Sequence, residues 1–226
     1  MSGRVPRRTC GEGAVLIDDL ILQILSKVQY LIVATRNTHK TREIQRILGA
    51  DFAVRDLSAY PEIPEAAESG KTFGENAVLK ATAASSQLPG RVVADDSGLE
   101  VDALGGAPGI YSARYAGQNA TNKQNIDKLL AELARVERAK RSARFRCVIA
   151  LAHGGKLLAT FEGVVEGVIV DPPRGRGGFG YDPIFVPQEF EQTFGELPAE
   201  VKNRISHRAR AIRLFAARLV ALKPSD

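Results

Sequence analysis

The 226-residue sequence contains no tryptophan, one methionine and two cysteines, and it has no long apolar run. A membrane-spanning helix needs about 20 consecutive apolar residues, so a spanning protein is excluded and no membrane partner is expected. Cys10 and Cys147 lie far apart and lack the spacing of metal-ligand pairs. A disulfide framework and a cysteine-based zinc site are therefore not expected, and this cysteine usage fits a reducing cytoplasm best.

The composition is typical of a folded, moderately basic protein, with 44% hydrophobic residues and a formal net charge of +5. A chain of this length supports one large domain, or one domain with two lobes, around a sizeable core. The positive charge suits an anionic partner, but nucleic acid, a nucleotide and simple solubility all fit it on charge alone.

Residues 1–29 are predicted to be an N-terminal extension ahead of a single domain over residues 30–222. Residues 1–13 are basic, small and glycine-rich, which is typical of a disordered segment. Residues 15–28 follow a helical rhythm, with the apolar residues largely on one face. A signal peptide is a poor match, because Asp18 and Asp19 interrupt the apolar stretch and no small-residue cleavage site follows. Two interpretations stay open: a short amphipathic helix that packs on the body or on a partner, and a dispensable tail from an upstream translation start.

The next segments predict a strand–loop–helix–strand unit over residues 30–34, 41–48 and 52–57, and hence parallel strands joined by a right-handed crossover. The pattern then predicts a helix at 73–86 capped by Thr72 with Glu75 as its capping box, a strand at 91–95, a glycine-rich loop at 96–109, a helix at 122–136, an antiparallel hairpin at 143–152 and 156–168, a short strand at 183–186, and a helix at 207–222 capped by Ser206. The fold class is α/β with a mixed sheet, in two lobes with a cleft between them.

The turn after the first strand carries the first candidate site. A strand that opens directly into a helix leaves unpaired backbone N–H groups at the positive end of the helix dipole. Thr35 and Asn37 add polar side chains there, and Lys40 adds a positive charge. This predicts a phosphate site without a Walker glycine pattern, although a plain helix cap with an exposed lysine fits the same residues.

Asp95 and Asp96 form the second candidate site. Successive strand residues point to opposite faces, so one carboxylate is expected to be structural and the other to enter the cleft. Asp96 is closer to the C-terminal end of the predicted strand, where ligands collect in open α/β sheets, and a carboxylate there can hold Mg²⁺ and activate a water. An Asp-Ser-Gly turn is the alternative interpretation.

Several upstream carboxylates could complete a metal site: Glu62, Glu65, Glu68 and Glu75. Mg²⁺ beside a triphosphate commonly takes only one or two protein carboxylates, so most of these are expected to be solvated or structural. The capping box already gives Glu75 a structural role.

Two further segments carry candidate binding residues. The glycines of 177–183 permit close backbone approach, and Phe179 between them could stack on a base. In 200–210, His207 and Arg208 fall in the first turn of a helix, where cations oppose the helix dipole. A solvated helix face is one interpretation; an anionic or acceptor-rich neighbour explains these two residues better.

Taken together, these segments resemble the inosine triphosphatase-type family of non-canonical purine nucleoside triphosphate pyrophosphatases. The resemblance lies in ATRNTHK at 34–40, TFGENAVLKA at 72–81, VADDSGLEVDALGGAPGIYSARY at 93–115, and the pair GFGYDPIF and SHRARA, all in the family's order. It extends over about residues 30–222. It implies an elongated α/β fold with the active site in a cleft between two lobes, a homodimer without a stable nucleic-acid partner, and Mg²⁺-dependent hydrolysis of inosine, deoxyinosine or xanthosine triphosphate to the monophosphate and pyrophosphate.

The resemblance also implies roles for individual residues. Asp96 is the proton acceptor and a Mg²⁺ ligand, with Glu68 as the second metal carboxylate and Glu65 as the next choice. The implied substrate-binding residues are Thr35, Arg36, Asn37, Thr38, His39 and Lys40 on the triphosphate side, Ser97, then Phe179, Gly180, Tyr181 and Asp182 around the base, and Lys202, His207 and Arg208 to complete base recognition. Arg36 stands where the family commonly has a small residue.

Two other functions fit parts of the sequence. A septum-formation-inhibitor-type pyrophosphatase would act on modified pyrimidine nucleotides. A basic nucleic-acid-binding module would use the Arg/Lys-rich stretch 135–146, but it would leave Asp95, Asp96 and the acidic loop without a role.

Overall fold

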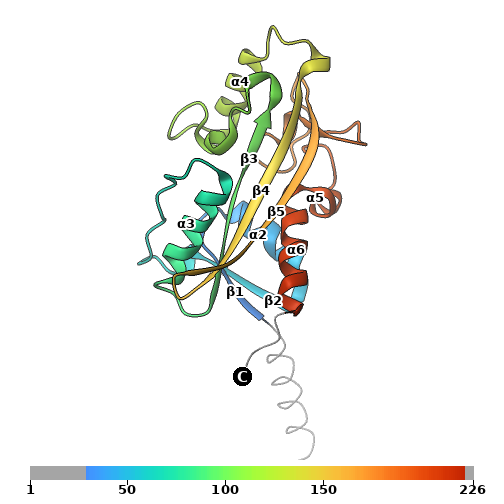
Figure 1. Ribbon diagram of the computed structural model, residues 1–226. Coiled ribbons are helices and arrows are strands. Elements are labelled where there is room, and N and C mark those ends of the chain that lie inside the picture. Colours follow the sequence, from blue (N-terminus) through green and yellow to red (C-terminus); the bar gives the residue numbers. More distant parts are fainter. Residues whose placement is uncertain (1–28, 222–226) are drawn as a thin grey trace, which may run out of the picture.

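A six-stranded mixed sheet runs through the computed structural model, which describes residues 29–221 (Figure 1). The strands are β1 (Gln29–Val33), β2 (Phe52–Asp56), β3 (Arg91–Val101), β4 (Ser142–His153), β5 (Lys156–Ile169) and β6 (Phe185–Pro187), in the order β2-β1-β3-β4-β5-β6. β1 is parallel to both β2 and β3, whereas β4, β5 and β6 are antiparallel to their neighbours. The predicted α/β class with a mixed sheet is confirmed.

Five α-helices flank the sheet in the described part of the chain: α2 (Thr38–Leu48), α3 (Phe73–Ser85), α4 (Asn122–Glu132), α5 (Ala199–Ile205) and α6 (His207–Ala221). None of the helices in this part is both long and apolar enough to cross a membrane. The predicted extension lies, apart from Gln29, outside the described residues.

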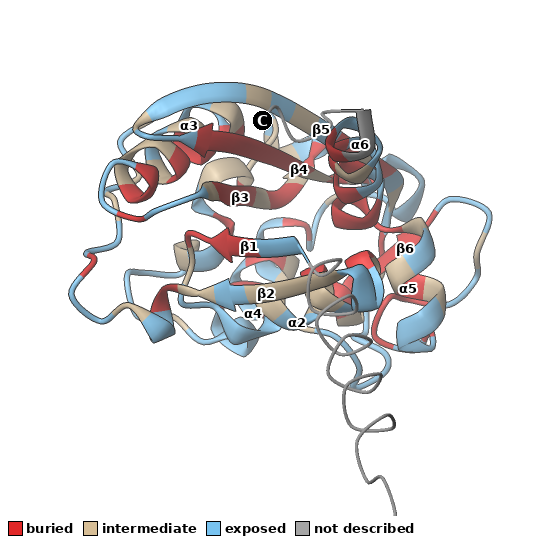
Figure 2. Ribbon diagram, turned by 90° about the horizontal axis from the view of Figure 1, so that it is seen from below, coloured by how far each residue is buried: buried red, intermediate tan, exposed pale blue. Residues whose placement is uncertain are grey.

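Three apolar clusters divide the body into two lobes joined by the long strands β3, β4 and β5 (Figure 1). In the first lobe α3 packs on one sheet face, while α2 and α6 pack on the other. In the second lobe the far ends of β3, β4 and β5 pack with α4 and β6. Figure 2 shows the buried residues concentrated along β3 and β4, between layers whose outer surfaces are exposed.

Helix starts are fixed by local hydrogen bonds. Asn37 caps α2, because its side chain accepts from the amides of His39 and Lys40. Thr72 caps α3 by accepting from the Glu75 amide, but the Glu75 carboxylate accepts from the Lys71 amide rather than from Thr72, so only half of the predicted capping box forms.

The strand that carries both aspartates is longer than predicted. β3 continues through the predicted loop to Val101, with an unbroken ladder to β4. Gly98 allows this, because a side chain there would clash with Ser112 and the Gly109 carbonyl of the segment packed against it. The prediction that Asp96 lies near the end of its strand is therefore wrong: Asp96 is in the middle of β3.

Asp96 nevertheless lies just beyond the end of a strand, because the neighbouring strand β1 ends before it. β1 pairs with β3 only through Ile32 and Val33, so β1 does not cover the edge of β3 beyond Val93. The chain then turns into α2 at this place, which brings the start of α2 next to Asp96.

The remaining differences from the predicted elements are smaller: α4 ends at Glu132, β6 begins at Phe185, and α5 was not predicted.

Candidate active site

Asp95 and Asp96 point to opposite faces of β3. The Asp95 carboxylate is 1% exposed and forms ion pairs with Lys40 of α2 and Arg208 of α6, the latter at 3.1 Å. Burial by itself would raise the pKa of Asp95, but Arg208 and Lys40 outweigh burial and hold the pKa well below its ordinary value. Asp95 is thus a permanently ionised carboxylate that joins three elements of the fold.

Asp96 faces the α3 side of the sheet. Its Oδ1 lies 2.8 Å from Lys80 Nζ, and Asn76 Nδ2 donates to its Oδ2 at 3.2 Å. Burial raises the pKa of Asp96 above its ordinary value even though Lys80 acts in the opposite direction. Asp96 lines a cavity, whereas Asp95 does not. The two neighbours therefore have the divided arrangement expected from the strand geometry.

Glu68 shares Lys80 with Asp96. Lys80 Nζ lies 3.1 Å from Glu68 Oε1, and Arg114 Nη1 lies 2.6 Å from Glu68 Oε2. Burial raises the pKa of Glu68, but Lys80 and Arg114 more than compensate and lower it.

The other acidic candidates lie elsewhere: Glu65 accepts from the Arg36 amide at 2.9 Å, Glu75 accepts from Lys71, and Glu62 is exposed. Residues 29–221 hold no cluster of three or more His, Cys, Asp or Glu side chains that could hold a metal ion. Asp96 and Glu68, with one ammonium group between them, nevertheless form a place for a cation. They suit a Mg²⁺ ion that takes two protein carboxylates and completes its shell with substrate oxygens and water.

The predicted phosphate loop, residues 35–40, lies beside these carboxylates, but its side chains are already engaged. Asn37 bonds two amides of α2, and Lys40 pairs with Asp95. Thr35 Oγ1 accepts from the Asn37 amide at 3.1 Å, and Thr38 is the exposed first residue of α2. The guanidinium of Arg36 donates to the carbonyls of Leu57 and Ile63.

Two adjoining cavities connect the phosphate loop with the other candidate residues. One, of about 700 Å³, is lined by cations and carboxylates, among them Lys40, Lys80, Arg114 and Glu68. The second, of about 160 Å³, has walls from both lobes and is lined by Asp96, Ser97, Phe179, Gly180, Tyr181, Asp182, Lys202, His207 and Arg208. Asn37, Lys40 and Glu68 line both cavities, so a charged compartment opens into a smaller one with aromatic walls.

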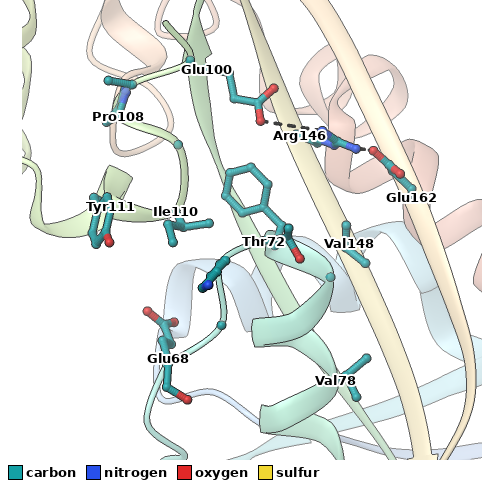
Figure 3. Close-up of a pocket in the computed structure, with 18 of the residues that line it drawn as sticks. Glu68, Thr72, Val78, Glu100, Pro108, Ile110, Tyr111, Arg146, Val148 and Glu162 are labelled. Atoms are coloured by element: carbon teal, nitrogen blue, oxygen red, sulfur yellow. Dashed lines mark hydrogen bonds and ion pairs between the residues drawn. The ribbon is translucent and has the colours of Figure 1, made fainter.

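A third and larger cavity, of about 1080 Å³, lies on the α3 side of the sheet (Figure 3). Its floor carries Arg146, which forms ion pairs with Glu100 and Glu162. Glu68 is the one predicted site residue of the described chain that lines it. Size alone therefore does not identify the cavity that brings the candidate residues together.

Six charged side chains form a continuous chain of ion pairs from the phosphate loop to the aromatic compartment. In order they are Lys40, Asp95, Arg208, Glu43, Lys202 and Asp182. Because the signs alternate and cancel, these charges can be buried together. At the far end, Asp182 accepts from the Phe179 amide at 2.7 Å, and Tyr181 donates to the Ser112 carbonyl at 2.9 Å. The chain thus fixes the loop that carries Phe179.

Two aromatic contacts shape the small cavity. His39 of α2 stacks on Phe179 with 5.4 Å between ring centroids, which joins the two walls. His207 stacks on Phe145 at 4.8 Å, and within the described chain its Nδ1 is buried without a hydrogen-bond partner. Burial lowers the pKa of His207 well below its ordinary value, and the nearby Arg208 and Lys202 lower it further. The lowered pKa favours the neutral ring, and Nδ1 has no hydrogen-bond partner among the described residues.

Four residues at the site were not singled out in the sequence: Glu43, Asn76, Lys80 and Arg114. Three of them lie inside the segments 72–81 and 93–115 that carry the family resemblance, so a signal was present. Glu43 lies about one helical turn after Lys40, and helical spacing could have placed the two on neighbouring parts of one face.

Comparisons with known proteins identify the family of this chain. The model of the Ham1 family matches residues 31–218. A dITP/XTP pyrophosphatase of Geobacter sulfurreducens is 53% identical over 82% of this chain and 94% of its own length, and one of Shouchella clausii is 52% identical over 80% and 92%. The solved structure of the Staphylococcus aureus Ham1 protein has a TM-score of 0.77 and 42% identity, covering 86% of this chain and 100% of its own. The resemblance seen in the sequence is thus confirmed, and the chain belongs to the Ham1 family.

Proposed function

We propose that this protein hydrolyses non-canonical purine nucleoside triphosphates, such as those of inosine, deoxyinosine and xanthosine, to the monophosphate and pyrophosphate, and so cleanses the nucleotide pool. The observation that carries the proposal is the position of Asp96. This carboxylate lines the aromatic compartment, and its partner Lys80 lines the adjoining cation-rich compartment, which matches a molecule with a base at one end and a triphosphate at the other. Relatives at about half identity are named dITP/XTP pyrophosphatase.

In the proposed reaction a water attacks the α-phosphorus, its proton passes to Asp96, and the bond to the leaving pyrophosphate breaks. Lys80 and Asn76 hold the two oxygens of Asp96, which fixes the carboxylate for this proton transfer. Lys40, Lys80 and Arg114 line the charged compartment and would offset the charge of the triphosphate.

The cofactor proposed here is Mg²⁺, held by Asp96 and Glu68. When bound, it would neutralise phosphate charge and lower the pKa of the attacking water. The fit rests on two carboxylates that already share one cationic neighbour, Lys80, at 2.8 and 3.1 Å.

Base selection is assigned to His207 and Arg208. A neutral imidazole with a free, buried Nδ1 and an adjacent guanidinium can bond the 6-oxo group of hypoxanthine and xanthine. The 6-amino group of adenine would leave buried donors unpaired, and a site built on such bonds can discriminate by roughly 10⁴-fold.

Pyrophosphate release from a panel of purine and pyrimidine triphosphates, with and without Mg²⁺, tests this function. Fast release from inosine triphosphate that requires Mg²⁺, with slow release from adenosine triphosphate, is the expected result. Equal rates for the two purines would end the specificity argument. Preference for modified pyrimidines would point to the septum-formation-inhibitor type instead.

A homodimer located in the cytoplasm, with residues 30–222 as the catalytic domain, completes the proposal. The family resemblance supports the dimer, and the sparse cysteines support a reducing compartment. Light scattering after size exclusion measures the mass in solution, and a monomeric mass at micromolar concentration would remove the dimer.

A further inference from the structure

Arg36 is a residue of the phosphate loop that lines the charged compartment, and its guanidinium is hydrogen-bonded to two backbone carbonyls. Its Nη1 donates to the Leu57 carbonyl and its Nη2 to the Ile63 carbonyl, each at 2.8 Å. The planar guanidinium can hold two acceptors at a fixed angle, which an ammonium group cannot do. The Arg36 side chain thus bonds two carbonyls that lie six residues apart in another part of the chain.

The backbone of Arg36 contacts the same region. Its amide donates to Glu65 Oε1 at 2.9 Å, and the preceding residue, Thr35, accepts at its carbonyl from the Leu57 amide at 3.0 Å. The phosphate loop is therefore tied to residues 57, 63 and 65 through one residue and its neighbour.

The segment that these hydrogen bonds hold, residues 61–71, also carries Glu68. Residues 61–71 contain no helix or strand. Their backbone bonds include a turn from Ile63 to Tyr60 and one from Ser69 to Ala67. The buried Ile63 side chain anchors the beginning of the segment, and Lys80 and Arg114 hold Glu68 towards its end. Arg36 fixes the carbonyl of that first anchor and so limits where Glu68 can lie.

We propose that Arg36 is a positioning residue for the acidic segment 61–70, and that it sets the affinity of the Glu68–Asp96 pair for a divalent cation rather than the affinity for the triphosphate. This inference rests on the proposed function, because it assigns Glu68 and Asp96 to a metal. A small residue at position 36 would leave the Leu57 and Ile63 carbonyls to water, and the segment would be held at fewer points. Arg36, which stands where the family commonly has a small residue, then adds a connection between the phosphate loop and the segment that carries the metal carboxylate Glu68.

The test compares full-length Arg36→Met, Arg36→Lys and, as a control on the exposed face of α2, Arg46→Met. Hydrogen exchange of segment 61–70 and Mn²⁺ binding by calorimetry without nucleotide are the primary measurements. Arg36→Met is expected to speed exchange in this segment about tenfold and to weaken Mn²⁺ binding about fivefold, with β3 and β4 unaffected. Arg36→Lys is expected to fall between, because the lysine ammonium lacks the planar fork that spans both carbonyls.

Three outcomes would overturn the inference. The first is unchanged exchange and Mn²⁺ affinity in Arg36→Met together with a raised KM for inosine triphosphate that Arg36→Lys restores, which identifies a phosphate ligand. The second is faster exchange throughout the protein, which identifies a general loss of stability. The third is a wild-type protein that binds no Mn²⁺. A wild-type protein that binds Mn²⁺ but releases no pyrophosphate from any triphosphate would instead refute the proposed function, and the exchange and binding measurements would still decide the role of Arg36.

Discussion

Asp95 and Arg208 form an ion pair in which each side chain is only 1% exposed, with 3.1 Å between Oδ2 and Nε. The pair joins β3 to the first turn of α6. It explains why a cation occupies a helix start, where the dipole disfavours it, because Asp95 and Glu43 supply the negative charge. Gly163 on β5 allows this approach, since a side chain there would clash with the His207 carbonyl.

Asp95→Asn is expected to destabilise the protein by about 3 to 5 kcal/mol, the usual cost of removing one partner from a buried pair. Arg208 and Lys40 would both lose their shared carboxylate and stay buried. Urea unfolding measures the change in free energy. A loss below about 1 kcal/mol, the range of an exposed pair, would contradict the structural role.

Asp96→Asn, one residue along, is expected to lower kcat by about 10³-fold, because the proposed proton acceptor is lost while the shape is kept. Pyrophosphate release at saturating inosine triphosphate measures the turnover, and circular dichroism checks the fold. Glu62→Gln, at an exposed carboxylate, is the control. Activity close to wild type in Asp96→Asn would remove Asp96 from the chemistry.

The division of labour between these aspartates could be predicted from sequence, because strand alternation is a local rule that holds wherever the strand continues. The length of the strand could not be predicted from sequence. Asp-Ser-Gly is also turn chemistry, and what keeps residues 96–101 extended is the ladder to β4 and the segment packed against Gly98. Both contacts come from residues distant in the chain.

The interaction partners of the site residues could not be predicted from sequence either. Lys80 contacts Glu68 and Asp96, which lie 12 and 16 residues away along the chain. Glu43 meets Lys202 and Arg208 across about 160 residues. The Arg36 side chain donates to two carbonyls of a neighbouring loop, 21 and 27 residues away along the chain. Such pairings depend on the packing of whole elements.

Glu43→Gln is expected to impair base recognition more than turnover. The Glu43 carboxylate accepts from both Lys202 and Arg208, and these two cations hold its pKa below the ordinary value although burial would raise it. Glutamine keeps the shape but presents an amide NH₂ to one of the cations. Arg208 and the Phe179 loop, tethered through Lys202 and Asp182, would then lose their fixed positions.

The measurement for Glu43→Gln is KM and kcat for inosine and adenosine triphosphates. A KM for inosine triphosphate raised about tenfold, with a smaller change in kcat and reduced preference over adenosine triphosphate, is the expected result. Glu62→Gln, at an exposed carboxylate, serves as the control. A fall in kcat alone with preference intact would place Glu43 with the reacting groups instead.

The stability of the protein is expected to fall as pH drops below about 6.5, the ordinary pKa of histidine. Burial, followed by Arg208 and Lys202, lowers the folded-state pKa of His207 well below that value. In the window between the two pKa values the unfolded chain binds a proton that the folded protein does not. Unfolding is therefore favoured as pH falls, by up to about 1.4 kcal/mol per pH unit.

Urea unfolding of wild type and His207→Gln at pH 7.5, 6.5 and 5.5 measures this contribution as the difference between the two slopes. His207→Gln is expected to be less stable at pH 7.5, because the stack on Phe145 is lost, and to lose less stability on acidification. Parallel curves would mean that the folded protein takes up the proton at His207 as readily as the unfolded chain does. The ring would then be charged at the lower pH values, and selection of the 6-oxo base could not rest on a neutral imidazole.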